Sequence, residues 1–248
     1  MKVDMFDSVI LANKKVCETP LELIKRVAPD KSPITYAGRL DPMAEGLMVL
    51  LNGDEVKEKE KYLKLDKVYE LTVLLGVSTD TYDTLGIIDE VSFKDLLPFS
   101  EVEQAVKAIP KKYSQPYPPF SSKPVNGKPL WWWAKNKKLG GIEIPSKDVE
   151  ISKISILEIK QESLEDVVLD IVGNIKKVKG DFRQKETIKL WKKTLEKNEE
   201  AKATTIKLLI SCSSGTYMRS MANSLGTSLS IPALALRIKR TRIGKFKI

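Results

Sequence analysis

The sequence predicts a mixed α/β fold, because patterns typical of strands and of helices interleave along the chain without a strict strand–helix alternation. Apolar runs and alternating patterns predict strands at residues 69–76, at two or three places within 149–172, and at 205–212. Amphipathic patterns predict helices at residues 19–27, 100–109, 184–200 and from about 216 to 224. No internal repeat or low-complexity linker divides the 248 residues, so we expect a single domain spanning 1–248.

Capping residues support two of the predicted helices. Thr19 is a suitable N-cap and Pro20 occupies the first helical position. Ser100 and Glu103 have the spacing of a capping box at the start of the second helix. The stretch from about residue 180 to 202 is interpreted as a helical insertion whose purpose the sequence does not reveal.

Turn residues and prolines mark the remaining segments. The strand at 69–76 is apolar enough to be largely buried, and residues 86–88 are expected to begin its hairpin partner. Residues 110–129 contain six of the thirteen prolines, so this segment must be extended or looped.

Composition excludes several classes of chemistry. The chain has no histidine and only two cysteines, so a Ser-His-Asp or Cys-His site, a His-ligated metal and a four-thiolate zinc site are all excluded. No apolar stretch is long enough for a membrane span and the N-terminus is not basic like a signal peptide, so we expect a cytoplasmic protein.

Positive charge indicates a polyanionic partner. The formal net charge is +9, and residues 111–147 contain eight lysines but a single acid, Glu143. Aromatic residues, including the run 131–133, interleave with these lysines. Ammonium groups contact phosphates and aromatic rings stack on unpaired bases, so this segment is interpreted as an RNA-binding surface. The alternative is a solvated basic face over a core that the tryptophans help to build.

Asp41 is the first candidate for chemistry. It precedes Pro42 and the apolar stretch 43–51, which is compatible with a helix capped by Asp41. An aspartate at a helix start stays ionised, and an ionised carboxylate presented by a loop can act as a nucleophile or base. The capping role and the chemical role are compatible, and both stay open here.

Arg219 is unusual for its position. It falls in the first turn of the predicted helix from about residue 216, where the helix dipole disfavours a cation. It therefore needs a carboxylate partner, unless it is simply exposed at the surface. Tyr69 opens the buried strand, and Asp80 and Asp83 are interpreted as turn-forming residues after it.

Five segments together resemble the successive motifs of the TruB-type tRNA pseudouridine synthases. They occur in family order over residues 38–246, and their sequences are GRLDPMAEGLMVL, KVYELTVLLGVSTDTYDTLG, QPYPPFSSKPVNGKPLWWWAK, CSSGTYMRSMANSLG and LALRIKRTRIGKF. The resemblance implies a mixed, largely antiparallel sheet flanked by helices, with an RNA-binding insertion at about 111–147. Bacterial members of the family commonly continue into a further C-terminal RNA-binding domain, which we do not expect here.

The resemblance also assigns roles at the catalytic centre. Asp41 would be the catalytic aspartate, Tyr69 would stack on the target base, and Arg219 would pair with Asp41. Tyr217 would line the same pocket and Leu236 would form an apolar wall.

The resemblance implies that further residues hold the RNA. They are Lys67 and the segment 115–135, which includes Lys123 and Lys135. Tyr36 stands where family members usually have a histidine, and it can still donate a hydrogen bond and stack on the substrate.

The implied activity is isomerisation of a uridine in the T-loop of tRNA, at position 55, to pseudouridine. This reaction requires no cofactor and no metal, the expected partner is tRNA, and the family habit is a monomer. A non-catalytic protein that binds or folds tRNA on the same scaffold is the alternative, and a guide-dependent synthase within a ribonucleoprotein is a weaker one.

Overall fold

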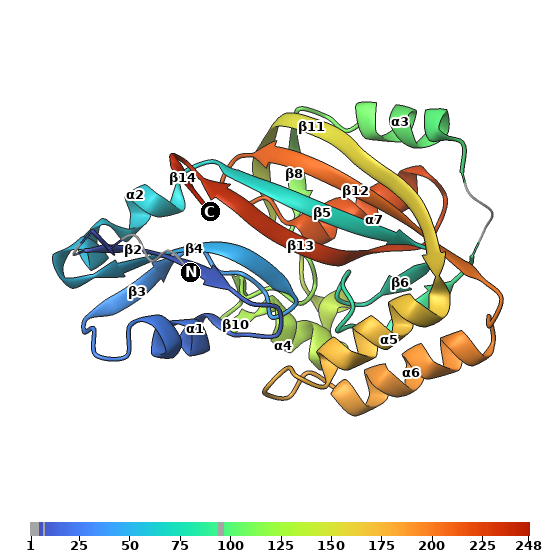
Figure 1. The fold of residues 1–248 in the computed structure, drawn as a ribbon, viewed down its shortest axis with the longest axis horizontal. Coiled ribbons are helices and arrows are strands. Elements are labelled where there is room, and N and C mark those ends of the chain that lie inside the picture. The colour runs from blue at the N-terminus through green and yellow to red at the C-terminus, as the bar shows by residue number, and fades with distance from the viewer. Residues whose placement is uncertain (1–4, 7, 94–96) are drawn as a thin grey trace.

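The computed structural model describes residues 5–6, 8–93 and 97–248. Its main feature is a ten-stranded sheet in the order β1-β2-β4-β13-β5-β12-β11-β8, with β14 beside β13 and β3 beside β4 (Figure 1). The strands of this sheet are β1 (Met5–Phe6), β2 (Val9–Lys14), β3 (Ile34–Ala37), β4 (Ala44–Asn52), β5 (Lys67–Leu75), β8 (Lys112–Pro116), β11 (Ser146–Ser163), β12 (Lys202–Cys212), β13 (Ala233–Ile243) and β14 (Phe246–Lys247). Among these pairings only β4 and β13 are parallel, so the predicted mixed, largely antiparallel sheet is confirmed.

Shorter elements surround this sheet. Two small hairpins form from β6 (Val77–Thr79) with β7 (Ile88–Val91) and from β9 (Pro124–Val125) with β10 (Lys128–Pro129). The helices are α1 (Pro20–Val27), η1 (Gly53–Glu58), α2 (Lys59–Leu63), α3 (Phe99–Lys107), α4 (Leu130–Lys135), η2 (Leu139–Gly141), α5 (Leu164–Ile175), α6 (Gln184–Glu196) and α7 (Met218–Ser228). None of these helices in the described residues is long and apolar enough to cross a membrane.

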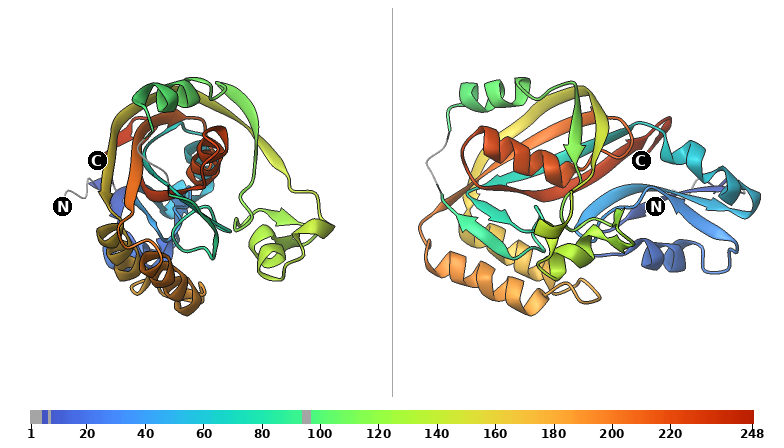
Figure 2. Two further views of the ribbon diagram at one scale, coloured as in Figure 1. Left: turned by 90° about the vertical axis from the view of Figure 1, so that its right-hand side faces the viewer. Right: turned by 180° about the vertical axis from the view of Figure 1, so that it is seen from behind.

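The central strands are covered on both faces. Leu71 and Val73 of β5 join one core together with buried residues of α7 and α3. Leu74, one position further, belongs to a second core with α5 and α6. Successive side chains of a strand point to opposite faces, so the two cores lie on opposite sides of the same sheet. Figure 2 shows the sheet curving around α7 and the α5–α6 pair lying outside it.

The segment at 111–147 forms a projecting arm. It comprises β8, the β9–β10 hairpin and α4, as expected for a proline-rich extended segment. In the left view of Figure 2 the yellow-green part of this arm stands away from the sheet. We call residues 111–147 the arm below.

Helix predictions with a local signal are confirmed. Thr19 accepts from the backbone N–H of Glu22, and Glu22 accepts from the backbone N–H of Thr19, so α1 begins with a complete capping box. Helices α6 and α7 lie within or close to their predicted ranges.

Three predictions about the sheet are wrong. Residues 44–52 form strand β4, not a helix capped by Asp41, because β4 is a central strand buried on both faces and so lacks strand alternation. Where two or three strands were predicted within 149–172, the single strand β11, which bulges twice, runs to Ser163 and α5 follows it. Strand β7 pairs with β6 and not with β5, because the chain bends at Gly76, whose φ is +99°.

The predicted cap of the second helix is also wrong. Helix α3 begins after Pro98, without a side-chain cap, and Ser100 lies inside its first turn. Proline is well suited to a helix start because its φ is already helical and it needs no N–H partner there.

Gly46 lies in the parallel pairing of β4 with β13, where the two backbones approach closely. It lies opposite Arg240 in the β4–β13 register and has φ +109°. A Cβ atom on Gly46 would lie within 3.0 Å of three backbone atoms of Arg240. We therefore predict that Gly46→Ala lowers the free energy of unfolding by more than about 3 kcal/mol, through backbone strain and steric overlap together.

Gly53→Ala is the matched control. Gly53 also has a positive φ, +63°, but apart from its chain neighbours no described atom lies within 4 Å of the place that an alanine methyl group would take. Strain alone should cost about 1–2 kcal/mol there. Urea unfolding of both variants measures the difference, and equal losses would contradict the steric role of Gly46.

Candidate functional site

A cavity of about 570 Å³ opens where several segments meet. Most of its walls come from the turn before β4, the start of β5, the 79–87 connection, the arm, the loop between α5 and α6, and the segment that leads into α7, and β13 and the start of α1 also contribute. Six of the predicted site residues line it: Asp41, Lys67, Tyr69, Lys135, Tyr217 and Arg219. Residues far apart in the sequence therefore converge on one site.

The structure pairs Arg219 with Asp41. The Nε of Arg219 donates to Oδ2 of Asp41 at 2.8 Å. The two terminal nitrogens of Arg219 donate to the backbone carbonyls of Thr81 at 2.8 Å and Phe120 at 3.3 Å. The Arg219 side chain is only 4% exposed, whereas that of Asp41 is 34% exposed. The guanidinium is thus buried and donates from each of its three nitrogens, and the carboxylate it holds faces the cavity.

A tight turn presents Asp41. The backbone N–H of Ala44 donates to the Asp41 carbonyl at 3.0 Å, and that of Cys17 donates to the Pro42 carbonyl at 2.8 Å. Buried Lys14 completes the turn, since its Nζ donates to the carbonyls of Ala44 at 2.5 Å and Pro42 at 3.2 Å. Asp41 is therefore positioned by strand ends and a lysine, and a helix dipole plays no part.

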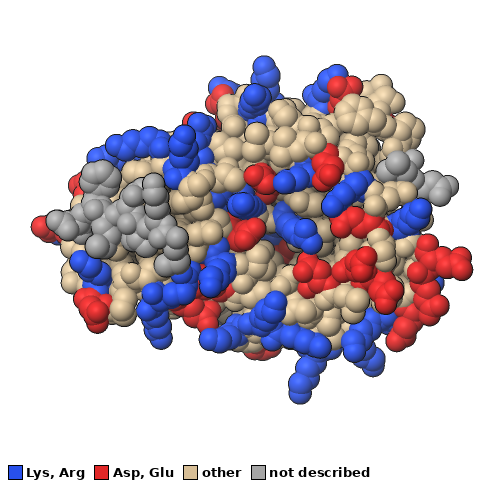
Figure 3. All heavy atoms as spheres, in the orientation of Figure 1, with Lys and Arg blue, Asp and Glu red and all other residues tan. Residues whose placement is uncertain are grey.

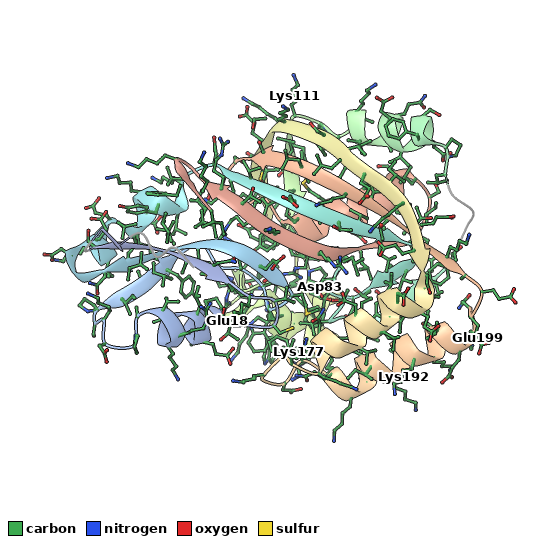
Figure 4. All side chains as sticks on the ribbon, viewed as in Figure 1. Glu18, Asp83, Lys111, Lys177, Lys192 and Glu199 are labelled. Atoms are coloured by element: carbon green, nitrogen blue, oxygen red, sulfur yellow. The ribbon has the colours of Figure 1, made fainter. Side chains whose placement is uncertain are left out.

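A second carboxylate lies near the same nitrogen of Arg219. Asp83, which Figure 4 labels beneath β13, has Oδ2 at 3.8 Å from the Arg219 Nε. Its Oδ1 accepts from the Thr81 hydroxyl at 2.6 Å and from the Leu85 N–H at 3.0 Å. Burial raises the pKa of Asp83, and the charge of Arg219 opposes that rise. The turn-forming role predicted for Asp83 is real, but no local pattern indicated its contact with Arg219.

Tyr69 and Lys67 begin strand β5 at the cavity. The Tyr69 side chain is buried against the cavity wall, and burial raises the pKa of its hydroxyl. Lys67 is also buried, and its Nζ donates to the carbonyls of Leu63, at 2.6 Å, and Leu65. Burial lowers the pKa of Lys67 to about 8. Its ammonium group is thus occupied by the backbone of the preceding turn.

Gln115 fixes Tyr217 to the arm. The Tyr217 N–H donates to Gln115 Oε1 at 2.7 Å, and the Gln115 amide donates to the Tyr217 carbonyl at 3.2 Å. The ring of Tyr217 meets Tyr117 edge-on, with 5.5 Å between centroids. Burial raises the pKa of Tyr217 to about 12, so its hydroxyl stays protonated at neutral pH.

Three predicted substrate-binding residues lie outside this cavity. Lys123 lies on the arm over the ring of Tyr117, at 5.3 Å, and Tyr36 lies on β3 under Lys59, at 5.5 Å. Leu236 lines a second cavity of about 260 Å³ instead, on the α5 side of β13. A bulge between Ala235 and Arg237 shifts the register of β13.

Ile238 is the apolar residue of β13 that lines the main cavity, together with Arg240. It lines both cavities, so it supplies the apolar wall that the family resemblance implies for Leu236. Alternation along a strand cannot separate residues 236 and 238, because both point to the same face until a bulge intervenes. The exposed Trp131 of α4 is a further lining residue, at 44% exposure.

The pKa of Lys14 yields a test of the turn that holds Asp41. Burial lowers this pKa from 10.5 to about 8, although Glu18 and Asp41 oppose the shift. Between these values the unfolded chain holds a proton that the folded protein has released, so the contribution of Lys14 to stability rises with pH. Relative to Lys14→Met, the wild type should gain up to about 3 kcal/mol of unfolding free energy from pH 8 to 10.5. Urea unfolding of both proteins across this range measures the difference, and a difference that falls with pH would contradict the buried ammonium.

Comparison with known proteins shows the family. Residues 25–173, more than half of the chain, match the model of the TruB family pseudouridylate synthase N-terminal domain. The tRNA pseudouridine synthase B of Listeria innocua is 32% identical over 86% of this chain and 58% of its own length. That of Aromatoleum aromaticum is 28% identical over 86% of this chain and 54% of its own length. The chain thus spans a little over half the length of these two relatives.

Solved structures share the fold at low sequence identity. A crystal structure of a Cbf5-Nop10-Gar1 complex matches 97% of this chain and 50% of its own, with a TM-score of 0.59 and 15% identity. A structure of an H/ACA RNP bound to a substrate RNA containing 2'-deoxyuridine matches 97% of this chain and 48% of its own, with a TM-score of 0.57 and 15% identity. Sequence motifs, family match and fold agree, and the chain belongs to the TruB family of pseudouridylate synthases.

Proposed function

We propose that this protein isomerises a uridine in the T-loop of tRNA, at position 55, to pseudouridine. The observation that supports it most is the pairing of Asp41 with the buried Arg219 beside Tyr69, in one cavity. Binding RNA alone does not need a carboxylate held by a buried guanidinium. The cavity volume, about 570 Å³, is in the usual range for sites that enclose a small ligand such as a nucleoside.

The reaction matches what these side chains can do. It breaks the N1–C1′ bond of uridine, rotates the base and joins C5 to C1′, with nothing oxidised and nothing added. Asp41 would assist by attacking the ribose or the base, or by removing the 2′ proton, and each path needs an ionised carboxylate. Arg219 fixes the direction of the Asp41 oxygen through its hydrogen bond.

The target uridine must leave its stack before it reaches Asp41. Extruding a base costs a few kcal/mol. Tyr69 lines the cavity, and stacking on its ring would return about 1–3 kcal/mol. Ile238 and Tyr217 would enclose the extruded base from other sides.

The arm would hold the RNA outside the cavity. Three of its lysines lie over aromatic rings: Lys123 over Tyr117, and Lys128 and Lys138 over Trp132. Phosphates and bases could therefore meet cations and rings on the same surface. On the face shown in Figure 3, acidic residues gather toward the end where α5 and α6 lie, which disfavours phosphates there. The arm is thus the better surface for the tRNA.

The decisive experiment compares the wild type with Asp41→Asn on an unmodified tRNA transcript. We expect the wild type to form pseudouridine at position 55, and the variant to lose at least about a thousandfold in rate, because asparagine can neither attack nor accept a proton. The rate is measured by mapping pseudouridine over time, and tRNA binding by the variant should be largely kept.

Asp54→Asn is the matched control for this change. Asp54 lies in η1, its side chain is 96% exposed, and it pairs only with Lys57 at 2.8 Å among the contacts of the described residues. It should isomerise uridine like the wild type. If the wild type binds tRNA firmly but forms no pseudouridine, the protein is instead a non-catalytic tRNA-binding protein.

The exposed ring of Trp131 gives a second test. Trp131→Ala should weaken tRNA binding by about 1–3 kcal/mol at fixed salt, because one base loses its stacking partner. Phe99→Ala is the control, since Phe99 is 58% exposed on α3 and does not line the cavity. Titration of labelled tRNA measures both, and an equal effect of the two variants would remove Trp131 from the RNA interface.

A further inference from the structure

The α5–α6 hairpin reaches the catalytic cavity. The two helices lie side by side in Figure 1, and their connecting loop supplies Asp181, Phe182 and Arg183 to the cavity wall. The loop and α6 lie beyond residue 173, where the match to the family model ends. They also coincide with the stretch from about 180 to 202, the insertion for which the sequence offered no purpose.

Helix α6 is fastened to the connection that contains Asp83. Trp191 is fully buried, and its Nε1 donates to the Thr84 carbonyl at 3.2 Å. The hydroxyl of Thr187, one turn earlier, donates to the Leu85 carbonyl at 3.2 Å. The helix therefore has a fixed place relative to residues 79–87.

Arg183, at the start of α6, binds two neighbours of the catalytic pair. Its terminal nitrogens donate to both carboxylate oxygens of Asp80, at 2.6 and 2.9 Å. Its guanidinium carbon lies 4.6 Å from the ring centroid of Phe120. A bidentate contact combined with stacking fixes an arginine in both direction and plane.

These two neighbours belong to the segments that hold Arg219. Arg219 donates to the carbonyl of Thr81, the residue after Asp80, and to the carbonyl of Phe120 itself. Arg183 thus contacts the side chains of Asp80 and Phe120, and Arg219 binds backbone carbonyls of the same two segments. These contacts link Arg183 to Arg219 and, through it, to Asp41.

The backbone at Arg183 is held in an uncommon conformation. Its φ is +60°, in the left-handed region that a residue with a side chain disfavours. Gln184 stabilises the loop, because its side chain accepts from the Phe182 N–H at 3.0 Å and donates to the Gly180 carbonyl at 2.7 Å. Such strain persists where the surroundings impose it, often beside a functional site.

We propose that Arg183 is a positioning residue of the proposed isomerisation, acting through Thr81 and Phe120 on Arg219 and so on Asp41. The inference rests on the proposed function. The insertion then has a purpose: it clamps, that is, it holds in place, the two segments whose backbone carbonyls, those of Thr81 and Phe120, orient the guanidinium of Arg219. Displacing a catalytic group by about 1 Å is enough to slow a reaction about a hundredfold, so a clamp of this kind affects the rate directly.

The test compares Arg183→Gln and Arg183→Lys with the wild type under saturating unmodified tRNA. Arg183→Gln should lower kcat about 10- to 100-fold while KM changes less than about twofold. Arg183→Lys keeps the charge but loses the bidentate contact, so it should restore only part of kcat. Arg237→Gln is the control, because Arg237 also binds the α5–α6 hairpin, through a single contact with Asp170 at 3.1 Å, but on the side of the second cavity.

A double substitution separates positioning from general loss of structure. Asp80→Asn and Arg183→Gln should each lower kcat, and the double variant should be no slower than the slower single variant, because both remove one contact. Additive losses would overturn the proposal. So would a wild-type kcat in Arg183→Gln, or a fall in kcat no larger than the unfolded fraction of the variant explains.

Hydrogen exchange supplies a readout that needs no turnover. In Arg183→Gln, protection should fall in peptides covering residues 79–87 and 117–122, and should persist in those covering α5. Unchanged protection at both segments would overturn the clamp. A wild type without isomerase activity, but with this loss of protection in the variant, would refute the proposed function and leave the clamp itself intact.

Discussion

The buried guanidinium of Arg219 is the constraint on which the site depends. A cation at 4% exposure is stable only if every direction of its planar group meets an acceptor. Arg219 finds Asp41 before β4, Thr81 after β6 and Phe120 in the arm. The partners come from three distant segments, so satisfying one side chain brings the turn, the connection and the arm to a single place. The proposed reaction needs these three segments to lie close together, and the burial of the Arg219 charge needs the same arrangement.

Two carboxylates share this arginine, and their surroundings separate them. Asp83 also lines the cavity but is only 5% exposed, and burial raises its pKa against the opposing effect of the two hydrogen bonds that its Oδ1 accepts. Asp41 is closer to Arg219 and one third exposed to the cavity. Different environments assign different roles to chemically identical groups. Asp83 helps to orient the guanidinium, and Asp41 is the group that a substrate can reach.

Prediction from sequence succeeded for the four helices and for the cap of the first, but not for the cap of the second. The capping box of α1 needs only Thr19 and Glu22, and the motif around Arg219 correctly indicated its need for a carboxylate. It failed at β4, because a strand buried on both faces has the same uniform apolar pattern as a buried helix. It also gave no indication of the contacts that Asp83 and Arg183 make, and it named Leu236 where Ile238 lines the main cavity. Those assignments depend on long-range contacts and on a strand bulge, which no local pattern encodes.

The walls of the cavity differ in how firmly they are held. The sheet strands and Arg219 fix Asp41 and Tyr69 through buried contacts, whereas Lys135 of the arm meets Asp181 of the α5–α6 loop through side chains that are 45% and 76% exposed. An exposed ion pair contributes less than about 1 kcal/mol, and incoming phosphates compete for its lysine. For the proposed function, this rim would separate to admit an RNA loop more easily than the buried charges beneath it would move. A site built in this way keeps its reacting groups in place while its entrance adapts to a bulky substrate.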